Sequence, residues 1–365
     1  MGMVQNPITT LLQPRQNARM TPTKPHSSAT VCSYFDSGTR RFREGWVAFL
    51  LLILATGAGA FDLQGHRGAR GLAPENTLPA FERALALGVT TLELDIGVTA
   101  DNVVVIAHDP YLNPTITRDA SGQWLQGSAQ GKGPTLRSLT LVQVQTYDVG
   151  RIQPESAYAK TFGTQQPVDG TRVPTLAALF ARVQALDAAH IRFNIETKIN
   201  PGQPDETVGP EAMVQALLAV VREAGMVQRV TIQSFDWRTL QLVQKLEPRI
   251  PTVYLTIQTA NTDNLKDGSW TAGFRLADHG SVPRLVKAAG GAVWSPNGGA
   301  LTEPLVKEAQ ALGLKVIPWT VNAPAELDKF IGWGVDGLIS DYPDRLREAV
   351  QRRGLPLPAP VKLAR

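Results

Sequence analysis

From Phe61 onward, short apolar runs alternate along the chain with stretches in which apolar residues recur at helical spacing. Eight of the apolar runs have the length of a β-strand; they cover 62–66, 90–97, 190–197, 229–234, 251–257, 292–296, 315–321 and 336–340. Stretches with helical periodicity lie between them, for example 77–87, 175–187, 210–224, 302–312 and 344–352. Strands that alternate with helices predict an α/β fold with a parallel sheet, most simply a closed (β/α)8 TIM barrel. A doubly wound open sheet is the alternative.

One further apolar run, 103–107, does not fit this alternation. It follows 90–97 after only a short polar turn around Ala100-Asp101-Asn102. A connection this short can join only antiparallel strands, because a parallel crossover needs about a dozen residues or more. We therefore expect a hairpin that brings His108 level with Leu94 and Asp95.

Residues 61–355 are expected to form one domain that contains an insertion at about 110–173. The inserted segment is rich in Gly, Gln and Ser and has weak periodicity, and its length exceeds that of an ordinary loop. We expect it on the catalytic face of the barrel, with a small core built from Tyr147, Tyr158 and Phe162. The proline-containing tail, 356–365, is expected to be extended or frayed.

Residues 46–60 form a short apolar run that follows three closely spaced arginines and ends in Ala-Gly-Ala. This order is typical of a secretory signal peptide with cleavage after Ala60, and the run is short for a membrane span of about 20 residues. An uncleaved anchor or a buried helix is the alternative. Residues 1–45 are interpreted as a disordered extension or the product of a mistaken upstream start. We expect an exported protein, periplasmic or secreted, with no stable membrane span in the mature chain.

The basic character of the chain comes from its first part. Six of the 36 basic and two of the 32 acidic residues lie in 1–60, which leaves 30 of each in the remainder. The pI of about 9.2 is therefore no argument for nucleic acid or membrane binding, and no nucleic-acid partner is expected. The only cysteine, Cys32, lies before the expected cleavage site, so the mature chain would have no disulfide, thiol nucleophile or Cys-based zinc site.

The end of the first predicted strand carries His66 and Arg67. Active sites of barrels lie at the carboxyl ends of the strands, so this position favours a catalytic histidine over a structural one. The guanidinium of Arg67 suits a phosphate, although an ion pair with Glu75 would also explain it. Just after Glu75, Asn76 or Thr77 is expected to cap the next helix.

Carboxylates and cations alternate onto one face of two other strands. Glu93 and Asp95 share a face because side chains alternate with period 2, and Glu196 and Lys198 repeat the pattern. Buried carboxylates are costly unless they are paired or bound to a metal. Glu93, Asp95 and Glu196 are therefore candidate ligands for one hard divalent cation, Ca²⁺ or Mg²⁺. A structural ion pair with Arg67 or Lys198 is the alternative.

The last two strands offer weaker candidates. Trp319 would serve either barrel packing or an apolar wall for substrate. Asp341 is expected to cap the helix that begins near Asp344. The two remaining histidines of this region, His190 and His279, have no evident partners in the sequence and are left out of the site.

With these residues identified, the chain resembles the glycerophosphodiester phosphodiesterase family. The matching stretches run in order over almost all of 61–345, and they are GHRGARGLAPENTLPAFERAL, TTLELDIGVTADNVVVIAHD, RVPTLAALF, RFNIETK, VTIQSFD, VIPWTVN and GLISDYPD. The resemblance implies a (β/α)8 barrel that hydrolyses glycerophosphodiesters to sn-glycerol 3-phosphate and an alcohol. It implies His66 and His108 as the general acid–base pair and Glu93, Asp95 and Glu196 as ligands of one divalent cation. It also implies that Arg67 and Lys198 contact the phosphate.

Three other functions compete with this expectation. The same barrel could act on lipids, as a phospholipase D-like, lysophospholipid or phosphoinositide phosphodiesterase, and an apolar rim in the insertion would favour that alternative. An exported binding protein without turnover would not need a pair of histidines. A glycosidase with two carboxylates would leave the strand-end Arg and Lys without a role.

Overall fold

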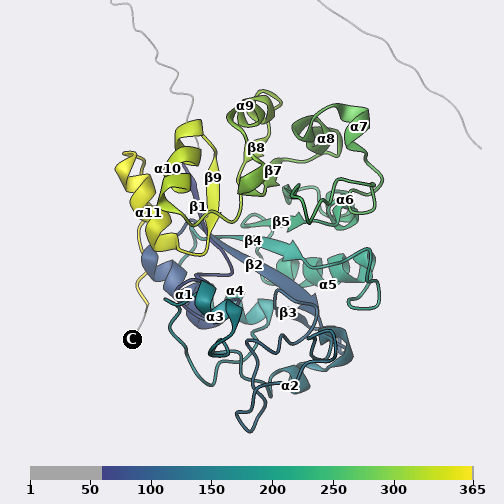
Figure 1. Cartoon of the computed structure of the whole chain (residues 1–365), viewed down its shortest axis with the longest axis vertical. Coiled ribbons are helices and arrows are strands. Elements are labelled where there is room, and N and C mark those ends of the chain that lie inside the picture. Colours follow the sequence, from purple (N-terminus) through teal and green to yellow (C-terminus); the bar gives the residue numbers. More distant parts are fainter. Residues whose placement is uncertain (1–59, 364–365) are drawn as a thin grey trace, which may run out of the picture. The chain divides into compact units, whose positions relative to one another are not determined.

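The computed structural model describes residues 60–363, and its parallel strands form a barrel surrounded by helices (Figure 1). The strands are β1 Asp62–Gly65, β2 Thr91–Val98, β3 Val104–Ile106, β4 Arg192–Thr197, β5 Val230–Ser234, β6 Thr252–Thr256, β7 Val293–Pro296, β8 Lys315–Val316 and β9 Gly337–Ser340. The α-helices are α1 Leu78–Leu87, α2 Leu141–Val144, α3 Ala157–Thr161, α4 Leu176–Ala185, α5 Pro210–Glu223, α6 Trp237–Leu246, α7 Leu276–His279, α8 Val282–Ala288, α9 Glu303–Ala311, α10 Pro324–Trp333 and α11 Pro343–Arg352. The expected signal peptide and the preceding extension lie outside the described residues.

The order of the parallel strands is β8-β7-β6-β5-β4-β2-β1-β9, with β1 paired to both β2 and β9. The chain that continues β8 bonds to β9: Ile339 donates to the Pro318 carbonyl at 3.1 Å and Val321 donates to the Ile339 carbonyl at 3.0 Å. The first and last strands are thus joined into a nearly closed barrel, as expected, and the open-sheet alternative is wrong. The predicted strand 315–321 is regular only over Lys315–Val316, because Pro318 has no N–H for the ladder.

The short strand β3 pairs with β2 in an antiparallel hairpin, as expected from the short turn. Ile96 lies opposite Ile106, and the Ala107 amide donates to the carbonyl of Asp95 at 3.0 Å. Continuing this register places His108 opposite Leu94. The hairpin therefore brings His108 to the carboxylates of β2.

The interior of the barrel contains a row of hydrogen-bonded amides. Asn194 Nδ2 donates to Gln64 Oε1 at 3.0 Å and to Gln233 Oε1 at 2.8 Å. Gln233 Nε2 then donates to Glu93 at 2.7 Å, and Gln64 Nε2 donates to Asp62 at 3.0 Å. These buried polar groups are satisfied by one another, as burial requires.

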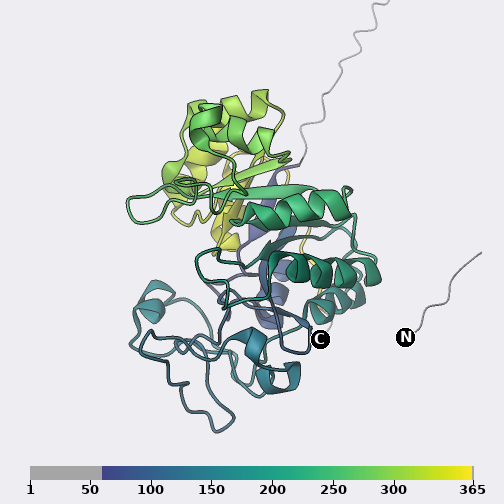
Figure 2. The same cartoon turned by 90° about the vertical axis from the view of Figure 1, so that its right-hand side faces the viewer.

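The segment 110–173 forms a lobe of loops and short helices beside the barrel (Figures 1 and 2). Its small core consists of aliphatic side chains, namely Leu112, Leu136, Val144 and Val173 of the segment together with Val105 of β3. Tyr147 packs against this core, whereas Tyr158 and Phe162 lie edge to face and contact Glu75 and Arg70 instead. The expected aromatic core is therefore only partly right.

The described part of the tail is extended and attached to the barrel. The amide of Val361 donates to the carbonyl of Leu85 in α1 at 2.9 Å, and the Val361 side chain is buried. Arg347 of α11 donates to the carbonyl of Pro358 at 2.8 Å. Fraying is therefore wrong for this segment up to residue 363. Within residues 60–363, no helix has the length and apolar character needed to cross a membrane.

Candidate active site

A cavity of about 140 Å³ opens at the carboxyl ends of the barrel strands. It collects most of the polar residues that the sequence singled out, together with several that it did not. The lining residues are His66, Arg67, Arg70, Glu93, Asp95, His108, Glu196, Lys198, Gln233, Phe235, Leu255, Trp319, Thr320 and Ile339.

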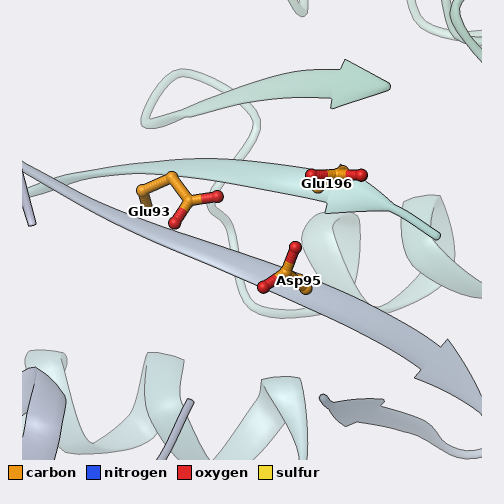
Figure 3. A group of neighbouring side chains, drawn as sticks. All are labelled: Glu93, Asp95 and Glu196. Atoms are coloured by element: carbon orange, nitrogen blue, oxygen red, sulfur yellow. The ribbon is translucent and has the colours of Figure 1, made fainter. Parts of the chain in front are cut away.

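Three carboxylates converge at this cavity. Glu93 and Asp95 lie on one face of β2, and Glu196 lies on the adjacent β4, directly opposite Asp95 in the register (Figure 3). One oxygen atom from each residue lies within 4.8 Å of the others, and all three residues are buried. This is a set of hard oxygen donors of the kind that Ca²⁺ and Mg²⁺ prefer.

The three carboxylates of this triad differ in how readily they ionise. Burial, assisted by Asp95, raises the pKa of Glu93 well above its ordinary value, and burial raises the pKa of Glu196 to about 7. Burial would also raise the pKa of Asp95, but His108, Lys198 and Arg67 outweigh it and lower that pKa. Lys198 and Arg67 thus stabilise the charged form of Asp95, whereas the charged forms of Glu93 and Glu196 remain unfavourable.

The two cations of the site are held against the carboxylates. Arg67 Nη1 bonds to Glu75 at 2.6 Å, and its Nε lies 3.5 Å from Asp95. Lys198 Nζ lies 2.8 Å from Glu196 and 3.7 Å from Asp95. Arg67 therefore makes the ion pair with Glu75 that was the alternative to phosphate binding, yet its buried Nε has no hydrogen-bond partner among the described residues.

The backbone at Arg67 is left-handed, with φ 48°, and this turns its N–H toward Glu93, which accepts it at 2.8 Å. The next residue, Gly68, has φ 83° and lies against α1, where a Cβ would be 2.7 Å from the carbonyl carbon of Ala80. Only glycine fits this position without strain. The local sequence therefore fixes the turn that presents both His66 and Arg67.

His66 is buried, and its Nδ1 lies 2.6 Å from Oδ1 of Asp341. Asp341 also accepts bonds from Arg70 at 2.6 and 3.0 Å and from Asn322 at 2.7 Å. The prediction that Asp341 caps the last helix is wrong: the N-cap of α11 is Tyr342, which makes no side-chain cap bond. In the closed barrel, β9 lies beside β1, so Asp341 at the end of β9 lies next to His66 at the end of β1.

Both histidines are neutral at neutral pH. Burial, assisted by Arg70, lowers the pKa of His66 to about 4, although Asp341 acts in the opposite direction. Burial and the charges of Arg67 and Lys198 also lower the pKa of His108. His108 Nδ1 lies 3.0 Å from its neighbour Asp109. Each imidazole thus bonds through Nδ1 to a carboxylate, and this orients its ring.

The residues after Arg67 divide between capping and the site. Thr77 is the N-cap of α1 and accepts a bond from Ala80. Asn76 does not cap: it has φ 55° and donates to Asp95 at 2.9 Å. Glu75 is buried, and it accepts hydrogen bonds from Arg67 and from Tyr158 of the insertion.

Trp319 combines the two roles that were considered for it. It packs against the small apolar cluster of Val253, Val293, Ile317 and Ile339 inside the barrel, and it also lines the cavity. Its ring meets Phe235 edge to face at 5.3 Å between centroids, so the two aromatics form one wall. His190 and His279 do not line this cavity.

Sequence reasoning gave no role in the site to Arg70, Asn322, Gln233 and Phe235, although Asn322 was placed with Trp319 at a strand end, and it wrongly assigned Asp341. Phe235, Asn322 and Asp341 directly follow predicted strands, and this position alone would have indicated the catalytic face. Arg70 and Gln233 carried no comparable signal.

The fold and this cavity together define a TIM-barrel enzyme with a buried acidic site. Residues 66–345 match the profile of the glycerophosphoryl diester phosphodiesterase family. The chain belongs to this family, as the resemblance of its motifs predicted, and it is a phosphoric diester hydrolase.

Named relatives support the assignment over most of the chain. A glycerophosphodiester phosphodiesterase of Bacillus subtilis (strain 168) is 29% identical over 282 residues, which span 76% of this chain and 83% of the relative. A crystal structure from Silicibacter pomeroyi DSS-3, provisionally named for the same activity, is 35% identical with a TM-score of 0.72. It covers 81% of this chain and 95% of that protein. A phosphodiesterase from Oleispira antarctica, solved with its product sn-glycerol-3-phosphate, shares the fold at 21% identity and a TM-score of 0.56, and covers 80% and 97% of the two chains.

Proposed function

We propose that this protein hydrolyses glycerophosphodiesters to sn-glycerol 3-phosphate and an alcohol, with one divalent cation and two acid–base histidines. The observation that carries the proposal is the buried triad of Glu93, Asp95 and Glu196, which lies in one cavity with His66 and His108. Family membership supports the reaction class. The product bound to the related phosphodiesterase of Oleispira antarctica supports the choice of product.

The residues fit a bound Ca²⁺ or Mg²⁺. The donors are carboxylate oxygens, and burial raises the pKa of two of the three carboxylates, so a bound cation would stabilise charged forms that burial makes unfavourable. When bound, such a cation supplies Lewis-acid stabilisation of the phosphate oxygens. Arg67 and Lys198 provide fixed positive charge at the same place, and the buried Nε of Arg67, which makes no hydrogen bond within residues 60–363, is a donor suited to an anionic oxygen.

The two histidines supply the proton transfers. Because both are neutral and bond through Nδ1 to a carboxylate, each can present Nε2 to the cavity. One takes a proton from the attacking oxygen at Nε2, and the other, once it has gained a proton at Nε2 and become an imidazolium, protonates the leaving alkoxide, each transfer contributing typically about 10²–10⁴ in rate. The attacking oxygen is either water or the 2-hydroxyl of the glycerol, in which case a cyclic phosphate forms first.

The test is release of glycerol 3-phosphate from glycerophosphocholine by the purified protein with Ca²⁺, with Mg²⁺ and with EDTA. Release that EDTA abolishes supports both the reaction and the carboxylate site, whereas release that needs no metal would remove the role of the triad.

His66→Ala and His108→Ala should each lower kcat by about 10²–10⁴. The control is His190→Ala, since His190 is exposed and lies outside the cavity. Near-full turnover by either active-site variant would refute the pair.

The lipid-cleaving alternative depended on an apolar rim in the insertion. Among the residues that the structure describes, the large exposed hydrophobic side chains are Val142, Val168 and Leu246, two of them in the insertion. Isolated apolar side chains of this kind are normal on a soluble surface and do not favour a membrane-bound substrate.

We also propose that the protein is exported, on the basis of the apolar run at 46–60. Expression of the full chain in a bacterial host, followed by N-terminal sequencing of the cell-envelope fraction, tests this. A mature N-terminus at Phe61 is expected. An intact chain confined to the cytoplasm would contradict it.

A further inference from the structure

A second and larger cavity, of about 260 Å³, adjoins the candidate active site on the His108 side. The two cavities share His108, Glu196, Lys198 and Phe235, so a substrate bound at the triad can extend into the second one. The remaining walls come from the insertion and from two loops of the barrel, and they contribute Asp109, Tyr111, Lys132, Glu206 and Trp270.

The walls of this second cavity combine aromatic rings with carboxylates. Tyr111 and Trp270 are half-buried and line it together with Phe235. Its charged side chains are the carboxylates Asp109, Glu196 and Glu206 and the ammonium groups Lys132 and Lys198. Their sum is one negative charge, which favours a cationic group over an anionic one.

The cavity already holds an ammonium group from the protein itself. Lys132 Nζ lies over the ring of Tyr111, 5.3 Å from its centroid, and makes an ion pair with Glu206. The bond to Glu206, followed by the charge of Glu206 and then Tyr111 and Asp109, raises the pKa of Lys132 and keeps it charged. An aromatic face with an adjacent carboxylate is the arrangement that recognises ammonium ligands, including quaternary ones.

We propose that this cavity binds the alcohol part of the diester and selects alcohols that carry an ammonium group. Lys132 competes with that ammonium group for the position beside Glu206 and over the Tyr111 ring. This inference rests on the proposed function, because it assigns the leaving group of that reaction to a place. In an ester such as glycerophosphocholine, two methylene groups separate the phosphate oxygen from the ammonium nitrogen. An uncharged alcohol gains neither the ion pair with Glu206 nor the attraction of the Tyr111 ring.

Lys132 has a specific role in this proposal. It extends from the glycine-containing stretch 127–133 of the insertion, and about a third of its side chain is exposed, so it can leave without disturbing the core. Removing its charge should therefore free the carboxylate of Glu206 for substrate. Removing the charge of Glu206 should act in the opposite direction.

The experiment measures kcat/KM for glycerophosphocholine and for glycerophosphoglycerol, whose head group is uncharged, and follows their ratio. Glu206→Gln should lower this ratio about 3- to 10-fold, and Lys132→Met should raise it by a similar factor, as expected for one partly exposed ammonium contact. The matched controls are Glu223→Gln and Lys160→Met, which change exposed residues outside both cavities and should leave the ratio unchanged.

The outcomes separate this inference from the proposed function. If both diesters are hydrolysed and neither variant changes the ratio, the proposed ammonium-binding site is refuted and the proposed reaction stands. A ratio that falls in Lys132→Met would also refute this site, because Lys132 would then assist the head group. Failure to hydrolyse either diester with any metal would refute the proposed function itself.

Discussion

The Nδ1 atom of His66 lies 2.6 Å from Oδ1 of Asp341, although 275 residues separate the two in the chain. Asp341 is buried and is fixed in place by Arg70 and Asn322. A buried, ionised carboxylate beside Nδ1 keeps the proton of a neutral imidazole on that atom, so Nε2 faces the cavity as a proton acceptor. The barrel thus sets the tautomer of His66 by placing β9 beside β1.

Asp341→Asn should lower kcat by about 10²–10⁴ and change KM much less, because an amide can donate to Nδ1 and favour the wrong tautomer. Steady-state kinetics with glycerophosphocholine measure this split. Asp328→Asn, which alters an exposed ion pair on α10, serves as the control. A thermal melt should accompany both variants, since Arg70 also loses a partner. A kcat within twofold of the parent would remove Asp341 from the positioning of His66.

The raised pKa of Glu196, about 7 compared with an ordinary value of 4.5, predicts how pH acts on the site without metal. Folding raises this pKa, so the group stabilises the folded state below about pH 4.5, and that contribution is lost as the pH rises through about 7. In EDTA the melting temperature should therefore fall between about pH 5 and about pH 8, and less so in Glu196→Gln.

The affinity for divalent cations should rise with pH, whereas the melting temperature in EDTA falls, because the cations bind the deprotonated carboxylate. Their affinity should rise about tenfold or more for each pH unit up to about pH 7, because Glu196 and Glu93 must both lose a proton, and less steeply above it. Isothermal titration calorimetry with Ca²⁺ and with Mg²⁺ over this range measures the slope. An affinity that is independent of pH, or that Glu196→Gln leaves unchanged, would exclude Glu196 as a ligand.

Gln233→Leu should weaken metal binding about 10- to 100-fold, because partners that orient a ligand contribute on this scale. The substitution removes the 2.7 Å bond to Glu93 and also an acceptor of Asn194. Gln241→Leu is a suitable control: it removes hydrogen bonds from α6 to Tyr254 and Ala289, outside the barrel. Equal metal affinity in the two variants would show that Glu93 does not need this support.

Gly68→Ala should destabilise the protein by about 2–4 kcal/mol and impair activity, because the new methyl group would overlap the backbone of α1 at a left-handed position. Gly170→Ala is the matched comparison: Gly170 has φ 82°, but a Cβ added there would meet no atom within 4 Å, so about 1 kcal/mol is expected from the backbone alone. Denaturant unfolding of both variants gives the difference. Similar losses at the two sites would mean that the close packing of Gly68 is unimportant.

The strands, and the strand ends that carry candidate site residues, could be predicted from the sequence because their signals are local. Alternation puts Glu93 and Asp95 on one face, and the short turn after Val98 leaves only a hairpin for the following strand. The partners of these residues were harder to find. Asp341, which Asn322 holds by a hydrogen bond, reaches His66 only because the barrel closes, and a local pattern cannot distinguish that contact from a helix cap.

The insertion shows the same limit. Aromatic residues suggested its core, but the aliphatic side chains of Leu112, Leu136 and Val144 form it, and Tyr158 turns to Glu75 at the active site. Long-range packing decides such choices, and the composition of a segment with weak periodicity does not reveal it.

The amide row inside the barrel has a consequence for protein design. Asn194 gives both of its amide protons to the two glutamines, so each glutamine must find an acceptor at the other side, Glu93 toward the reaction and Asp62 toward the opposite end. Grafting only the three acidic side chains onto another scaffold would leave Glu93 without its side-chain donor, Gln233. A transferable version of this centre would have to include Gln64, Asn194 and Gln233 as well, and with them the consecutive strands β1, β2, β4 and β5 in their present register.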